Sequence, residues 1–121
     1  LDNGEVSYLR ANIVGGYNRA IKRIVERRNS NGLRVDTVGF VNFFSKLSDL
    51  NFGIQFGSEI IRANHPSLGP DFGGFYSTDR TNPNPKGQAL IANEFIKVIN
   101  RAFGATIPLL RPDDYQANKI P

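Results

Sequence analysis

The opening stretch of the chain has the apolar repeat of one long helix. Asp2 and Glu5 have the spacing of a capping box, and Gly32 is a suitable stop. Between these ends, apolar side chains recur every three or four residues along one face, at Val6, Leu9, Ile13, Tyr17, Ala20, Ile21, Ile24 and Val25. Gly15 and Gly16 in the middle predict either a bend or a close backbone contact, unless the helix simply tolerates them.

A second amphipathic helix is predicted near the other end of the chain, with Asn84 as its cap, Pro85 in its first turn and its end at Phe103-Gly104. We expect burial of its apolar stripe, which consists of Ile91, Phe95, Val98, Ile99 and Ala102. The prolines after Gly104 predict an extended tail that packs on the rest of the domain through Ile107, Leu109 and Leu110.

The region between the two helices is more varied. Residues 33–40 are β-prone and follow the first helix directly, which predicts a helix leading into a strand. Residues 41–50 can form a short helix, and the alternation in residues 51–56 is typical of an exposed strand or hairpin. Residues 62–85 hold most of the Pro, Gly and Asn, so we expect a long loop there, and loops of that length are usually functional.

The formal charge of +4 is modest, and much of it lies on the first helix, at Arg19, Lys22, Arg23, Arg27 and Arg28. Exposed aromatic side chains or Gly-rich turns would accompany such a stripe in a nucleic-acid groove, whereas Tyr17 belongs to the apolar face here. The charge pattern therefore favours a solvated helix face, and no nucleic-acid partner is expected.

Composition is consistent with one compact domain over residues 1–121, because 40% of the residues are apolar. The sequence has no apolar run long enough to span a membrane. It has no Cys, which excludes disulfides and a cysteine nucleophile. Because the chain starts with Leu1 and contains no Met, we expect that further residues precede it.

The residues most informative about chemistry run from Phe75 to Phe103. Within this block Asp79 and Asn82 stand three residues apart, followed by Pro83 and by Gly87 near the start of the last helix. A loop just before a helix can place two such side chains close together. This block resembles the last block of bacterial SGNH/GDSL hydrolases, in which an Asp and a His three residues apart supply two members of a Ser-His-Asp triad.

The resemblance extends over nearly the whole chain, and it implies a three-layer α/β/α fold with a mainly parallel sheet, of which this chain is the C-terminal part. It also implies a serine ester hydrolase acting on lipids, acylated sugars or other acyl esters, with Asp79 as the triad Asp and no cofactor. Secretion, or a periplasmic or cell-surface location, follows from the same resemblance. The family's nucleophile block has no match here, so an N-terminal half or a partner chain must supply it.

Asn82 stands where the family carries His, and an amide cannot take a proton from a serine hydroxyl near neutral pH. Three alternatives follow: a fragment of a hydrolase, a degenerate module that binds but does not hydrolyse, and an unrelated interaction domain.

His65 is the only histidine. It lacks an Asp three residues before it and is interpreted as a surface-loop residue. Ser77 is interpreted as a turn residue, and Asp36 as a strand-end residue that could reach a site. One His and no Cys provide no metal-ligand pairing, and the chain has no Gly-rich phosphate loop.

Overall fold

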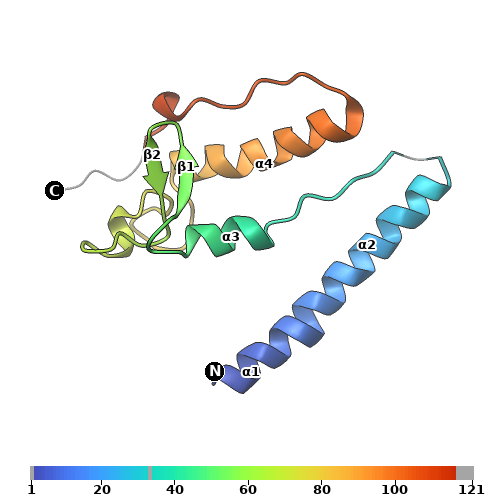
Figure 1. The fold of residues 1–121 in the computed structure, drawn as a ribbon, viewed down its shortest axis with the longest axis horizontal. Coiled ribbons are helices and arrows are strands. Elements are labelled where there is room, and N and C mark those ends of the chain that lie inside the picture. The colour runs from blue at the N-terminus through green and yellow to red at the C-terminus, as the bar shows by residue number, and fades with distance from the viewer. Residues whose placement is uncertain (1, 33, 117–121) are drawn as a thin grey trace. The chain divides into compact units, whose positions relative to one another are not determined.

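The computed structural model describes residues 2–32 and 34–116, which form the fold in Figure 1. The chain divides into two compact units, Leu1–Thr37 and Val38–Pro121. Each unit is described by itself.

The first unit is a continuous helical run made of α1 (Asn3–Tyr8), a π-helical segment (Leu9–Val14) and α2 (Gly15–Ser30) (Figure 1). The predicted capping box is present: Asp2 Oδ1 accepts the Glu5 N–H at 2.8 Å, and Glu5 Oε2 accepts the Asp2 N–H at 2.8 Å. The π-helical turn ends at Gly15, where an added Cβ would lie 3.1 Å from the Arg10 carbonyl oxygen. The close backbone contact predicted for this glycine pair is therefore confirmed at Gly15.

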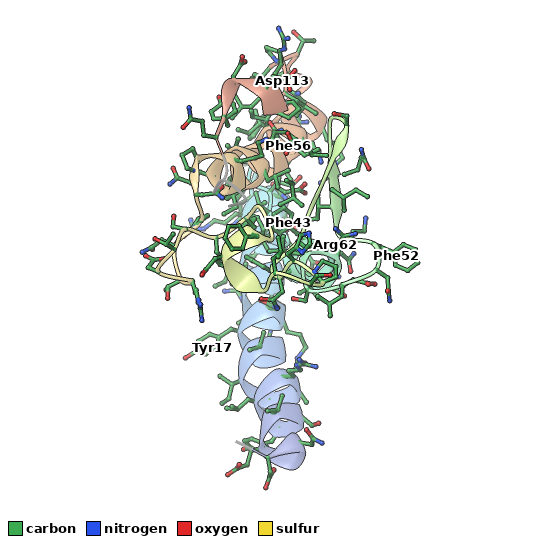
Figure 2. The ribbon with its side chains drawn as sticks, turned by 90° about the vertical axis from the view of Figure 1, so that its left-hand side faces the viewer. Tyr17, Phe43, Phe52, Phe56, Arg62 and Asp113 are labelled. Atoms are coloured by element: carbon green, nitrogen blue, oxygen red, sulfur yellow. The ribbon has the colours of Figure 1, made fainter. Side chains whose placement is uncertain are left out.

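The apolar face of this helical run has no buried residue. Its large side chains are exposed, including Tyr8, Leu9, Ile13, Tyr17, Ile21 and Ile24. Tyr17 projects sideways from the helix in Figure 2.

The strand predicted for residues 33–40 is wrong over residues 34–40, where the backbone is irregular, and Leu33 lies outside the described residues. A strand needs a neighbouring backbone to pair with. Instead, the Asn29 amide binds both main-chain groups of Val35, accepting its N–H at 2.9 Å and donating to its C=O at 2.8 Å. β-propensity alone does not make a strand when the described part of the chain offers no partner.

The second unit begins with α3 (Val41–Leu47), followed by the antiparallel pair β1 (Ile54–Phe56) and β2 (Glu59–Ile61). The short helix is confirmed, although α3 ends three residues earlier than expected. The Asp49 carboxylate explains the early end, because it accepts the N–H groups of Asn51 and Phe52 in a turn. The hairpin is also confirmed, but residues 51–53 lie outside its strands, and Phe56 is buried where an exposed strand was predicted.

α4 (Pro85–Phe103) begins and ends as predicted, with Asn84 as its cap and Gly104 at φ 63° beyond its end. The long loop expected before it is present, and a 3₁₀ turn at Pro70–Phe72 is its one regular segment.

The predicted buried stripe of α4 is wrong: Phe95 is 47% exposed, Ile99 is 37% exposed, and Ile91, Val98 and Ala102 are half-buried. The helix buries a different face, made of Lys86, Gly87, Ala89, Leu90 and Asn93. α4 is apolar on two sides, and the second side is only partly covered: Phe95 contacts the ring of Phe40 at a centroid separation of 5.7 Å, and Ile91 packs against the core.

The core of the second unit gathers side chains from α3, the hairpin, the loop and α4. Its buried members are Phe43, Leu47, Phe56, Ile61, Phe75, Ala89 and Leu90. Phe43 and Phe56 appear in Figure 2. The ring of Phe75 makes edge contacts with Phe43 and Tyr76, at centroid separations of 5.9 Å and 4.8 Å.

The extended tail after Gly104 runs back along α4 and is attached by two asparagines. Asn93 accepts the Leu110 N–H at 2.8 Å and donates to its C=O at 3.2 Å, and Asn100 makes the same pair of bonds with Ile107. The predicted apolar packing holds for Leu110 and is wrong for Ile107 and Leu109, which are 42% and 47% exposed.

The protein is thus a mixed helix and strand fold. In residues 2–32 and 34–116 the only sheet is the two-stranded hairpin β1–β2. No helix in these residues is long and apolar enough to cross a membrane.

Candidate functional site

The candidate site is the turn at residues 77–82, in the loop that leads into α4. The Ser77 N–H donates to the Asn82 carbonyl at 2.8 Å, and the Arg80 N–H donates to the Ser77 carbonyl at 2.9 Å. Outside the turn, Tyr76 and Pro83 form an isolated antiparallel bridge. These main-chain bonds close a tight, exposed turn that presents two polar side chains, Asp79 and Asn82.

Asp79 and Asn82 lie side by side in this turn, as their spacing predicts. Asp79 Oδ2 accepts a hydrogen bond from Asn82 Nδ2 at 2.7 Å. Asp79 Oδ1 accepts the main-chain N–H groups of Thr81 and Asn82, each at 3.0 Å. Both side chains are exposed to solvent.

The carboxylate of Asp79 is stabilised as an anion by these three donors. The Thr81 N–H contributes most, followed by the main-chain and side-chain N–H groups of Asn82, and together they hold the pKa of Asp79 below its ordinary value. The turn therefore keeps a fully ionised, oriented carboxylate at neutral pH.

The amide of Asn82 can do only part of what an imidazole does in this position. Its N–H binds the carboxylate, as a histidine ring N–H would. Its nitrogen lone pair is delocalised into the carbonyl, so the side chain cannot accept a proton from a hydroxyl near neutral pH. The pair can orient a group or bind a ligand, but it does not supply general-base catalysis.

Arg80 lies within the turn and connects it to the preceding loop. Its φ of 60° lies in the left-handed region, which costs a non-glycine residue about 1 kcal/mol or more. Its guanidinium binds Asp71 with two hydrogen bonds, of 2.9 and 3.2 Å, and this contact lowers the pKa of Asp71. The ion pair ties the turn to the 3₁₀ segment Pro70–Phe72 and offsets part of the backbone cost.

Asn84 and Gly87 fix the turn to α4. Asn84 is buried, and its Oδ1 accepts the Gly87 N–H at 2.8 Å, while its Nδ2 donates to the Gly74 carbonyl at 3.1 Å. A Cβ on Gly87 would lie 2.4 Å from the Phe75 carbonyl oxygen, so only glycine fits there. The loop thus enters the helix at one defined position.

The other residues singled out in the sequence are held within their own turns. His65 Nδ1 accepts the N–H groups of Ser67 and Leu68, at 3.2 and 3.1 Å, which agrees with a loop residue. Ser77 is a turn residue, as expected. Asp36 belongs to the first unit, where its carboxylate accepts the Thr37 N–H at 2.7 Å.

Sequence reasoning missed two ion pairs of this region, Asp71–Arg80 and Glu59–Lys86. Lys86 is a buried residue whose ammonium group binds both Glu59 oxygens at 2.7 Å, which links β2 to the first turn of α4. Partners nine and 27 residues apart carry no local sequence signal. Within the described residues, no three His, Cys, Asp or Glu side chains come close enough to hold a metal ion.

Comparison of the chain with protein-family models, with curated proteins and with solved structures finds no match.

Proposed function

We propose that this chain is the C-terminal part of an SGNH/GDSL-type serine ester hydrolase domain, with Asp79 as the orienting carboxylate of its site and Asn82 in the position of the base. The substrate class is an acyl ester of a lipid or a sugar, and the location is secreted, periplasmic or at the cell surface. The nucleophilic serine comes from an N-terminal half or a partner chain.

One observation carries this proposal: the 2.7 Å hydrogen bond from Asn82 Nδ2 to Asp79 Oδ2, in an exposed turn just before α4. In a Ser-His-Asp triad the carboxylate accepts a ring N–H and so fixes the orientation of the base. The same donor and acceptor arrangement is present here, with an amide in place of the ring. The three donors on Asp79 favour the ionised form that this role requires.

The uncovered apolar surfaces support a three-layer α/β/α arrangement. The apolar face of the first unit's helix has no buried residue, and on α4 Phe95 and Ile99 remain 47% and 37% exposed even though Phe95 contacts the ring of Phe40. Residues 34–40 are β-prone but form no strand in the described part of the chain. A parallel sheet that includes residues 34–40 and packs against both helices would cover all of these groups.

The second candidate is a module of the same type that binds its ligand without hydrolysing it. Asn82 favours this alternative, because its amide donates a hydrogen bond to Asp79 but cannot act as the general base. The two candidates differ in one measurable property, the turnover of a simple ester by a protein that contains both halves.

The test uses the full-length protein that contains these residues and compares four forms: unaltered, Asn82→His, Asp79→Asn with Asn82→His, and His65→Ala. With a nitrophenyl ester we expect turnover near background for the unaltered protein, because loss of a triad base costs about 10⁶-fold in measured serine hydrolases. Asn82→His is expected to raise turnover by several orders of magnitude. Adding Asp79→Asn should remove most of that gain, about 10⁴-fold.

Fast turnover by the unaltered protein that His65→Ala abolishes would move the base to His65 and overturn the role of Asn82. No gain from Asn82→His, in a protein shown by circular dichroism to be folded, would favour the binding module. A crystal structure of the full-length protein without a parallel sheet beside α4 would overturn the family proposal itself.

A further inference from the structure

A hollow of about 610 Å³ lies in the second unit, beside α3, the start of β1 and the middle of α4. We refer to it as the α3–α4 hollow. Its polar lining side chains are Asn42, Lys46, Gln55, Glu94 and Lys97. A volume of this size is typical of pockets for small organic ligands. Neither Asp79 nor Asn82 lines it.

The apolar lining of the hollow contains both buried and exposed side chains. Phe43 and Ile54 are its less exposed lining residues, Phe43 being buried and Ile54 half-buried. Phe52 also lines the hollow, is 75% exposed and projects from the edge of the unit, whereas Phe43 points inward (Figure 2). A flat aromatic face is therefore open to solvent beside polar groups.

The backbone that carries Phe52 is fixed by its neighbours. The Phe52 N–H donates to Asp49 Oδ1 at 3.3 Å, and the Gly53 N–H donates to the Asp49 carbonyl at 3.2 Å. Gly53 has φ 63°, and a Cβ there would lie 2.7 Å from the Ile61 carbonyl oxygen. Ligand binding to Phe52 would thus require little ordering of the chain.

The rim of the hollow carries one excess positive charge. Lys97 Nζ binds Glu94 Oε1 at 2.9 Å, so these two charges compensate each other. Lys46 forms no ion pair within residues 2–32 and 34–116. A ligand with one negative group therefore complements the rim.

We propose that the α3–α4 hollow binds an acidic sugar unit, a pyranose ring that carries a carboxylate. The C–H face of the ring stacks on Phe52, because C–H groups are positively polarised and an aromatic face is negative. The carboxylate pairs with Lys46, and the ring hydroxyls bind the Asn42 amide, the Glu94 carboxylate and Gln55 Oε1, since Gln55 Nε2 already donates to the Gly57 carbonyl.

The lining favours this ligand over simpler ones. A fatty carboxylate would complement Lys46, but its hydrocarbon chain would replace water at the exposed amides of Asn42 and Gln55 without offering them hydrogen bonds. A neutral sugar would leave the charge of Lys46 unpaired. An inorganic anion has no C–H face for Phe52.

The hollow is compatible with a further layer on α4. Lys97 lies four residues after Asn93 and seven after Leu90, so it is on the face that packs on the core of this unit. Phe95 and Ile99 lie on the other side. The binding proposal therefore does not depend on the proposed ester hydrolase.

The test is a titration of the ¹⁵N-labelled full-length protein that contains these residues with trigalacturonate, with neutral maltotriose and with octanoate. Trigalacturonate is expected to give saturable shifts of the amides of Asn42, Gly53 and Gln55. Maltotriose should bind more weakly. Octanoate should not shift all three of these amides. Added salt should weaken the binding of trigalacturonate, because the Lys46 contact is electrostatic.

Two variants with matched controls assign the contacts. Phe52→Ala is expected to weaken binding about tenfold, and Lys46→Gln several-fold for the acidic sugar only. Tyr17→Ala removes an aromatic side chain of similar exposure, 71%, outside the hollow, and should change nothing. Lys22→Gln removes a lysine from the first unit and should also have no effect.

Several outcomes would overturn the proposal. One is the absence of saturable shifts with trigalacturonate. A second is tighter binding of octanoate, which would make the hollow an acyl-chain site. A third is an equal loss of binding in Lys22→Gln and Lys46→Gln, which would reduce the interaction to general charge attraction. None of these results bears on Asp79 and Asn82, so the two proposals fail separately.

Discussion

The two long helices of this protein look alike in sequence and behave differently in structure. The run of α1, the π-helical segment and α2 has no buried residue, whereas α4 buries Lys86, Gly87, Ala89, Leu90 and Asn93. Both carry an apolar stripe in the sequence, and burial is predicted for the stripe of α4. An amphipathic pattern shows that a helix has a face to cover, but it does not show which element covers it.

The stripe of α4 makes the same point within one helix. The repeat that includes Phe95 and Ile99 is the more regular pattern, yet the unit packs on the less apolar side, through Ala89, Leu90 and the stem of Lys86. That side is selected by contacts that are distant in sequence, namely with the hairpin and the loop around Phe75.

The largest expected contrast between the two helices comes from one substitution at a glycine in each. Gly87→Ala places a Cβ 2.4 Å from the Phe75 oxygen, and we expect destabilisation of about 1–3 kcal/mol or more. Gly16→Ala meets nothing closer than the Arg19 guanidinium at 4.0 Å, and should stabilise its helix by up to about 1 kcal/mol. Urea unfolding with amide exchange measures both effects. A neutral Gly87→Ala would mean that the loop around Phe75 is not fixed against α4.

A smaller contrast comes from asparagines that bind the backbone in the same way in both units. Asn93 binds Leu110 in a buried position, so Asn93→Ala leaves main-chain groups unpaired and should cost about 1–3 kcal/mol. Asn29 binds Val35 at an exposed position, where water can replace the amide, and Asn29→Ala should cost about 0.5 kcal/mol or less.

Asn100→Ala separates burial from the choice of helix. Asn100 lies on α4 with Asn93, but its bonds to Ile107 are exposed. We expect it to behave like Asn29. If Asn100→Ala cost as much as Asn93→Ala, membership of the second unit rather than burial would set the energy.

Features with local causes could be predicted from the sequence. The capping box at Asp2, the Asn84 cap with Pro85, the hairpin and the Asp79–Asn82 contact each depend on residues within a few positions of one another. Features set by distant partners could not be predicted. These are the irregular backbone of residues 34–40, the buried face of α4, the Lys86–Glu59 ion pair and the α3–α4 hollow. A strand above all depends on a neighbour, and single-segment propensity does not identify one.

The smallest expected effect concerns Asp79, the one carboxylate in the candidate turn. Its pKa is lowered in the folded state, so it stabilises the fold at pH values above its unfolded pKa, and that contribution is lost as the pH falls through the folded pKa. Carboxyl ¹³C NMR should show Asp79 titrating below an ordinary aspartate. Asn82→Ala removes one of three donors and should raise the pKa only partway, because the two main-chain N–H groups remain.

Thr81→Ala is the matched control, since its hydroxyl donates to the Asp79 carbonyl and not to the carboxylate. A full return to the ordinary pKa in Asn82→Ala would show that the side-chain amide, and not the turn, holds the carboxylate ionised.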